Sequence, residues 1–190
     1  MIFDPDRHNR HSTRLIGHDY SQAGAYFVTV CTRDRECRFG DVAGGEMRLN
    51  SEGEIVVDTW EWLAIQHGYI ELDEWVVMPN HLHGIIVILD DWCRGGSRTA
   101  PTTAAPTFNK GKPLGRLVGA FKTVSTRRIN LMNDNQGVPI WQRNYYDHII
   151  RNEQSLARIR QYIVTNPMHW EIDRENPSPT CKRAGEEWEP

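Results

Sequence analysis

Two apolar runs divided by a Pro-Asn pair constrain the fold of this chain most strongly. The runs are "IELDEWVVM", residues 70–78, and "HLHGIIVIL", residues 81–89, and both are rich in β-branched and aromatic side chains. Proline and asparagine favour tight turns, so the segment predicts a strand, a turn at Pro79-Asn80 and a returning strand. The chain is therefore expected to contain an antiparallel sheet.

Further strands and a helix are predicted before this hairpin. Residues 25–33, "AYFVTVCTR", are β-branched and aromatic and predict a strand. Gly44-Gly45 lies between two short apolar pieces and indicates a second hairpin. Residues 51–69 begin with Ser51 and Glu54 at the spacing of a capping box and repeat apolar residues at helical intervals, so they predict an amphipathic helix.

After the hairpin the sequence predicts a helix over 113–132, a strand over 141–150 and a last helix from Asn152, its cap, to Pro167, its end. The full order is strand, hairpin, helix, two strands, helix, strand, helix. Helices that return to one mainly antiparallel sheet make an α+β sandwich.

The 190 residues suit one core with flanking segments. Residues 1–24 are polar and predict an arm, and residues 171–190 form an acidic tail. The segment from about 91 to 113 is rich in Gly, Ser, Thr, Ala and Pro and is expected to be a mobile loop. With neither a membrane-length apolar run nor a secretory signal, we expect a cytoplasmic protein that has no membrane partner.

Charge is distributed unevenly along the chain. The net charge is −3, yet residues 92–133 hold eight Lys or Arg and no Asp or Glu. Residues 171–190 reverse this balance, with six acidic and three basic residues. Because acidic residues are missing from it, the basic segment favours contact with phosphates, and the alternative is the solvated face of an amphipathic helix.

His81 and His83 lie at the start of the returning strand. Side chains at positions i and i+2 of a strand project from the same face, so both imidazoles are expected to point to one spot. Paired imidazoles suit a metal site, but the pattern also occurs as two hydrogen-bonded histidines at a strand end.

Tyr162 and Asn166 lie four residues apart on the predicted last helix and therefore share a face. Leu156, Ile159 and Ile163 form the buried stripe of that helix, and Tyr162 lies at its flank. The tyrosine ring can thus pack while its hydroxyl reaches a cleft, although a border tyrosine often has a packing role alone.

Taken together, "WVVMPNHLHGIIVI" and "WQRNYYDHIIRNEQSLARIRQYIVTNP" resemble the HUH single-strand DNA transposases, and most closely their REP-associated tyrosine transposase branch. The resemblance extends from "GAYFVTVCTRDR" to "YIVTNPMHW". It implies a ferredoxin-like sandwich over residues 25–170 as the catalytic domain. By the same resemblance, His81 and His83 are metal ligands, Tyr162 is the nucleophile and Asn166, where relatives often have Gln, is the third ligand.

The activity that the resemblance implies is cleavage and rejoining of single-stranded, hairpin-forming DNA through a 5′-phosphotyrosine. The cofactor it implies is Mg²⁺ or Mn²⁺, whereas imidazole ligands alone favour Mn²⁺ or Zn²⁺. The alternative is a hairpin DNA-binding module that has the fold without cleavage. The sequence does not choose between a monomer and a homodimer.

Other residues have candidate roles around this site. His148 is either a supporting hydrogen-bond donor in the cleft or a histidine bonded within the sheet. Tyr145 and Tyr146 are candidates for packing or base stacking. The candidate DNA-binding cations fall in the arm and the basic segment: Arg7, Arg10, Arg14, Lys110, Lys112, Arg116, Lys122, Arg127 and Arg128.

Overall fold

The computed structural model describes residue 15 and residues 17–90 and 112–177. Most of the predicted arm and loop and the end of the acidic tail lie outside these residues, as do four of the candidate DNA-binding cations, namely Arg7, Arg10, Arg14 and Lys110.

A four-stranded antiparallel sheet forms the centre of the molecule. Its strands are β1 (Gly24–Cys31), β4 (Ile70–Met78), β5 (His81–Ile88) and β6 (Tyr146–Ile150), in the order β4-β5-β1-β6. The predicted hairpin turn at Pro79-Asn80 joins β4 to β5. These two strands are antiparallel, and Met78 lies opposite His81. A small sheet of β2 (Gly40–Ala43) and β3 (Glu46–Leu49) lies apart from it.

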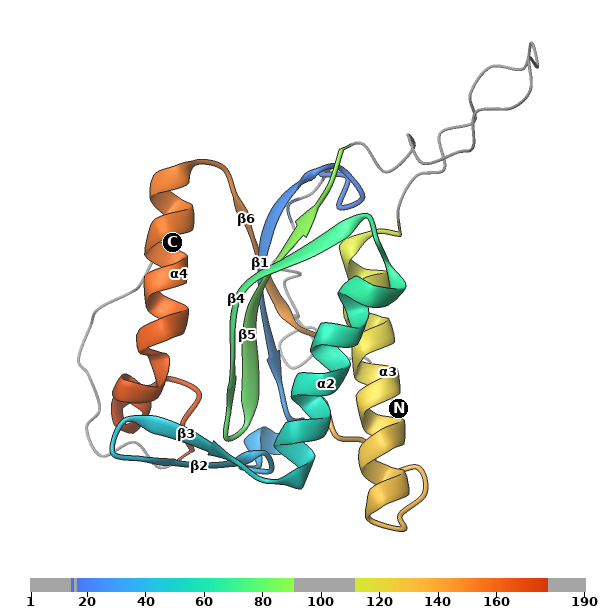
Figure 1. Cartoon of the computed structure of the whole chain (residues 1–190), viewed down its shortest axis with the longest axis vertical. Helices are drawn as coiled ribbons and strands as arrows, with labels where there is room; N and C mark the ends of the chain where they lie inside the picture. The colour runs from blue at the N-terminus through green and yellow to red at the C-terminus, as the bar shows by residue number, and fades with distance from the viewer. Residues whose placement is uncertain (1–14, 16, 91–111, 178–190) are drawn as a thin grey trace, which may run out of the picture.

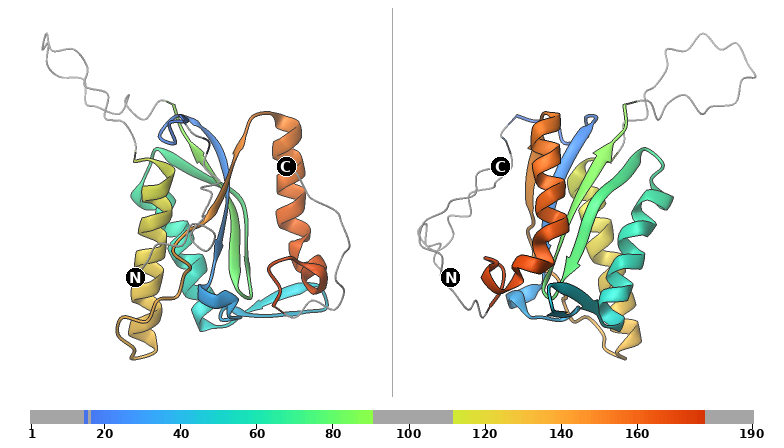
Figure 2. Two further views of the ribbon diagram at one scale, coloured as in Figure 1. Left: turned by 180° about the vertical axis from the view of Figure 1, so that it is seen from behind. Right: turned by 60° about the vertical axis from the view of Figure 1, so that its left-hand side comes forward.

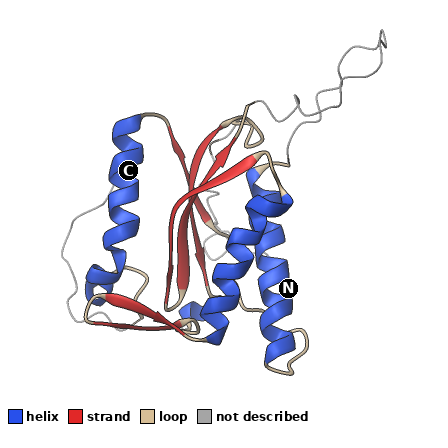
Figure 3. Ribbon diagram, viewed as in Figure 1, coloured by secondary structure: helices blue, strands red, loops and turns tan. Residues whose placement is uncertain are grey.

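Helices cover both faces of the main sheet (Figures 1 and 3). The pair α2 (Ser51–Gln66) and α3 (Leu114–Met132) covers one face, and α4 (Glu153–Thr165) covers the other, as the side view in Figure 2 shows. Along the chain, β1, α2, β4, β5, α3 and β6 give the βαββαβ order of a ferredoxin-like sandwich. The predicted fold class is therefore confirmed.

One hydrophobic cluster lies on each face of the main sheet, because neighbouring residues of a strand point to opposite sides. Tyr26, Val28 and Leu82 belong to the larger cluster, under α2 and α3. Phe27 and Ile85 belong to the smaller cluster, with Ile159 and Ile163 of α4. The α4 face therefore has the thinner apolar layer, and polar side chains share it.

Several predicted boundaries differ from the structure, and two of them are the cap of α2 and the start of the last strand. The cap of α2 is Asn50, whose side chain accepts from the Gly53 amide, so the capping prediction at Ser51 was one residue late. The last strand begins at Tyr146 and not near Trp141. Trp141 forms an isolated antiparallel bridge with Thr32, and the carbonyls of Gln142 and Asn144 that follow it accept from the Lys122 ammonium.

The other predicted turns and caps are confirmed. Gly44 and Gly45 join β2 to β3 with φ of 63° and 80°, a conformation that favours glycine at both positions. Asn152 caps α4 by accepting from the Ser155 amide. The α-helix ends at Thr165, and a 3-10 turn, η3 (Asn166–Ile172), continues the chain with Pro167 in its first turn. No helix among the described residues has the length and apolarity that a bilayer crossing needs.

Candidate metal and tyrosine site

His81 and His83 project from β5 toward the α4 face of the sheet, while Leu82 between them packs in the opposite cluster. The exposed fractions of the two histidines are 0% and 3%. Their ring centroids lie 4.4 Å apart. The predicted convergence of the two imidazoles is thus present in the structure.

Each ring is held through its Nδ1 atom. The Asn80 Oδ1 lies 2.8 Å from Nδ1 of His81, and the Thr29 Oγ1 lies 2.8 Å from Nδ1 of His83. Nδ1 contacts of this kind leave Nε2 as the ligand atom and fix the orientation of the ring. The sequence analysis did not predict that Thr29 contacts a histidine, and it predicted only a turn at Asn80.

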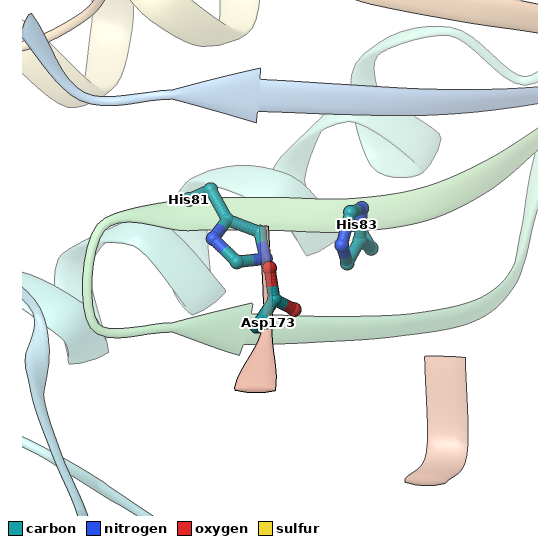
Figure 4. A group of neighbouring side chains, drawn as sticks. All are labelled: His81, His83 and Asp173. Atoms are coloured by element: carbon teal, nitrogen blue, oxygen red, sulfur yellow. The ribbon is translucent and has the colours of Figure 1, made fainter. Parts of the chain in front are cut away.

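Asp173 brings a carboxylate to the two rings (Figure 4). One ligand atom from each of His81, His83 and Asp173 lies within 4.8 Å of the others. Asp173 follows η3, in the part of the chain that the sequence assigned to the acidic tail. Its position depends on an irregular turn, so no helical or strand period could have indicated it.

Asn166 lies at the junction of α4 and η3 and is 2% exposed. Its Nδ2 donates to Oδ2 of Asp173 at 3.1 Å. Its Oδ1 is buried and has no hydrogen-bond partner among the described residues, and the same is true of Nε2 of His81. Such unsatisfied acceptors are costly unless a ligand uses them.

Tyr162 completes the cluster from α4. Its hydroxyl lies 3.2 Å from Nε2 of His83, and its ring contacts Phe27 edge to face. The ring is therefore packed while the hydroxyl reaches the histidines, as the flank position on the helix predicted.

Burial sets the protonation of the cluster. It lowers the pKa of His83 to about 3, and together with His83 and Arg35 it holds the pKa of His81 well below its usual value. The pKa of Tyr162 is raised far above its ordinary range, first by burial and then by Asp173 and Glu175. The two imidazoles are therefore neutral at pH 7 and the phenol keeps its proton.

The donor set fits a divalent cation. His81, His83 and Asp173 offer two neutral imidazole nitrogens and a carboxylate oxygen within 4.8 Å of one another. Among the described residues, Nε2 of His81 and Oδ1 of Asn166, whose Nδ2 bonds Asp173, are buried and have no hydrogen-bond partner. Hard oxygen ligands suit Mg²⁺ and Mn²⁺, while imidazole suits the softer ions.

His148 and Tyr146 lie on β6, at the other side of β1 from the histidines. His148 is opposite Phe27, and Tyr146 is opposite Thr29, which is itself paired with His83. Tyr146 thus lies in the same cross-strand row as His83, and His148 lies one row further along. The supporting role predicted for His148 stays a prediction.

The described part of the basic segment, residues 112–133, lies on the other face of the sheet, along α3. Lys122 turns inward, with its ammonium 2.8 Å and 2.7 Å from the carbonyls of Gln142 and Asn144, and burial lowers its pKa to about 8. Arg127 and Arg143 line a surface groove of about 690 Å³. Among the described residues, the exposed members of the predicted cationic set are Lys112, Arg116, Arg127 and Arg128.

Comparisons with known proteins give one relative in sequence and one solved structure with a similar fold. No family model matches the chain. An uncharacterised protein of Haemophilus influenzae is 37% identical over 171 residues, which cover 88% of this chain and 93% of that protein. A solved REP-associated tyrosine transposase, bound to a REP hairpin, superposes with a TM-score of 0.54 at 20% identity over 82% of this chain and 73% of that chain. At this identity the superposition establishes the shared fold.

Proposed function

This chain belongs to the same protein family as the Haemophilus influenzae protein and shares the fold of a REP-associated tyrosine transposase, and from that premise we propose that it is a metal-dependent tyrosine transposase. It would cleave and rejoin single-stranded DNA that forms hairpins. The observation that carries the proposal is that the Tyr162 hydroxyl lies 3.2 Å from Nε2 of His83, one of three residues that could together hold a metal ion.

His81, His83 and Asp173 would hold the divalent cation, Mg²⁺ or Mn²⁺, and Asn166 would add its buried Oδ1. When bound, the ion would stabilise the charge that develops on the scissile phosphate. Asn166 would also hold Asp173 in place, since its Nδ2 donates to the carboxylate. The amide side chain therefore has two uses in the same site.

Tyr162 would act as the nucleophile. Its oxygen would form a bond to phosphorus as the bond to the 3′ oxygen breaks, and the phenolic proton would pass to that 3′ oxygen, which leaves a 5′-phosphotyrosine and a free 3′-hydroxyl. Reversal by a second 3′-hydroxyl would rejoin strands, so no nucleotide cofactor is needed. Because Nε2 of His83 contacts the phenol here, use of that nitrogen as a ligand would release the hydroxyl for attack.

Binding of the DNA would involve both faces of the sheet. The exposed cations of α3 would neutralise phosphates away from the scissile bond, and Tyr146 would offer a ring for base stacking. The predicted arm, with Arg7, Arg10 and Arg14, would add to this contact. The enzyme would act in the cytoplasm, where the DNA is.

Tyr162→Phe tests the proposal because it removes the hydroxyl and keeps the ring that packs on Phe27. A labelled DNA hairpin with single-stranded flanks is incubated with protein and Mn²⁺, and denaturing gels reveal any covalent adduct. Wild type should form an adduct that EDTA prevents, and Tyr162→Phe should form none. Tyr146→Phe is the matched control, since its ring also contacts Phe27, and it should retain the adduct.

Two outcomes would contradict the proposal in different ways. If Tyr162→Phe cleaves as well as wild type, the tyrosine is not the nucleophile. If wild type binds the hairpin but cleaves with neither Mn²⁺ nor Mg²⁺, the chain is a DNA-binding module with this fold.

A further inference from the structure

Asn80 lies in the turn between β4 and β5, and its side chain makes three hydrogen bonds although it is only 1% exposed. Its Oδ1 lies 2.8 Å from Nδ1 of His81. Its Nδ2 donates to the carbonyl of Glu175 at 2.7 Å and to the carbonyl of Arg35 at 3.1 Å. One buried amide thus joins three segments that are remote in sequence.

The chemistry of these partners fixes which way the Asn80 amide points. Both partners of Nδ2 are backbone carbonyls, which only accept, so a reversed amide would place its oxygen against two other oxygens. Oδ1 must therefore face His81, and because Oδ1 accepts, Nδ1 of His81 carries the proton. In the neutral ring Nε2 is then the free lone pair, directed into the cluster.

The segment that Asn80 holds, residues 173–176, is termed the strap here. Arg35 holds it as well, since its Nη1 lies 2.7 Å from Oε2 of Glu175 and 3.1 Å from the carbonyl of Arg174. The strap begins with Asp173, the carboxylate of the cluster. The position of this carboxylate thus depends on the same side chain that orients His81.

We propose that Asn80 is a positioning residue that couples the orientation of His81 to the docking of the strap. The proposal rests on the metal site proposed above. One amide would position two ligands together: its oxygen orients the His81 imidazole, and its nitrogen holds the carbonyl of Glu175, two residues after Asp173. By linkage, a cation that binds these ligands must stabilise the docked strap as much as the docked strap strengthens cation binding.

Asn80→Asp separates the two halves of this role. The carboxylate still accepts from Nδ1 of His81, but it cannot donate to Glu175 and repels both carbonyls. Asn80→Ala removes both functions. Asn130→Asp is a control of similar burial, since Asn130 is 8% exposed and donates to the carbonyl of Val138 at 3.0 Å, on α3.

Three measurements follow, each with protein whose fold is first checked by circular dichroism. The His81 tautomer is taken from ¹⁵N chemical shifts of the metal-free protein, strap docking from hydrogen exchange of residues 174–176, and affinity from the free Mn²⁺ signal in electron paramagnetic resonance.

Asn80→Asp should keep the Nδ1–H tautomer yet exchange faster in the strap. Asn80→Ala should lose both the single tautomer and the slow exchange, and should bind Mn²⁺ about 10–100-fold more weakly. Asn130→Asp should match wild type in all three measurements. Added Mn²⁺ should slow exchange in the wild-type strap and do so far less in Asn80→Asp.

The proposal is overturned if Asn80→Ala keeps the tautomer, the exchange rate and the affinity of wild type. It is also overturned if Asn80→Asp leaves the strap as protected as in wild type. These results are distinct from failure of the proposed function. If wild type forms no adduct and binds no Mn²⁺, the transposase proposal fails, whereas the tautomer and the exchange of metal-free protein still decide the role of Asn80.

Discussion

At the scale of single residues, the reactivity of the Cys31 thiol depends on the residues around the candidate site. Its thiol donates to Oε2 of Glu175 at 3.4 Å. Burial and the Glu175 carboxylate raise the pKa of Cys31 to about 12. Since the thiolate is the reactive form, this thiol should be nearly inert at neutral pH, in contrast to the exposed Cys37.

We expect iodoacetamide to modify Cys37 first in a variant whose Cys93 and Cys181 are replaced by Ser. Below the pKa the thiolate fraction grows about tenfold per pH unit, so the rate at Cys31 should still be rising at pH 10. Glu175→Gln should speed the reaction at Cys31, because it removes a carboxylate that raises the pKa. Equal rates at the two thiols at pH 8, measured by mass spectrometry, would contradict this assignment.

Residue patterns in the sequence predict the site only where a regular element sets the geometry. Strand alternation suffices to bring His81 and His83 to one face, and the helical period suffices to put Tyr162 at the border of its apolar stripe. Asp173 follows an irregular turn, and Asn80 bonds residues 45 and 95 positions away, so no local period reports either contact.

At the scale of elements, Gly84 allows α2 to lie close to β5. A Cβ atom at this position would come 2.5 Å from the Trp60 ring and 3.2 Å from Cβ of Trp75. Gly84→Ala should therefore lower the free energy of unfolding by about 1–3 kcal/mol, the usual cost of an overfilled core. Urea unfolding followed by tryptophan fluorescence measures it.

Gly119→Ala is the matched control on α3. A Cβ atom there meets nothing within 4 Å, so the change should raise the free energy of unfolding by about 0.5–1 kcal/mol through helix propensity. Equal effects of the two substitutions would show that close packing at Gly84 is not what matters.

The type and order of the helices and strands can be predicted from the sequence, but their first and last residues are predicted less accurately. Periodicity identifies the strands and helices, and the β4-β5-β1-β6 order agrees with the fold that the resemblance implied. Residues 141–145 do not join β6 as one strand: Trp141 pairs with Thr32 in an isolated bridge, and the next carbonyl, that of Gln142, accepts from Lys122, twenty residues earlier. Local propensity does not report such contacts between elements.

At the scale of the whole molecule, one chain supplies every group of the candidate site. Helix α4 packs on its own sheet through Ile159 and Ile163. Arg160 of α4 also binds both carboxylate oxygens of Asp73 on β4, at 2.8 Å and 2.6 Å. The structure therefore presents Tyr162 to the histidines of the same chain.

We expect no complementation between two inactive variants as a result. A mixture of His81→Ala and Tyr162→Phe proteins, denatured together and refolded so that subunits can exchange, should form no more adduct than either protein alone. Wild type treated in the same way is the control for refolding. Recovery of the adduct in the mixture would mean that α4 is exchanged between two subunits.

The sheet lies between the surface proposed to bind DNA and the site proposed to cleave it, so substitutions can alter one without altering the other. Helix α3, with its exposed cations, and helix α4, with Tyr162, lie on opposite faces of the same four strands. Substitutions on the outer surface of α3 do not touch the histidines, the tyrosine or the strap. Under the proposed function, the DNA targets of descendant proteins can therefore diverge while the chemistry of strand cleavage is inherited unchanged.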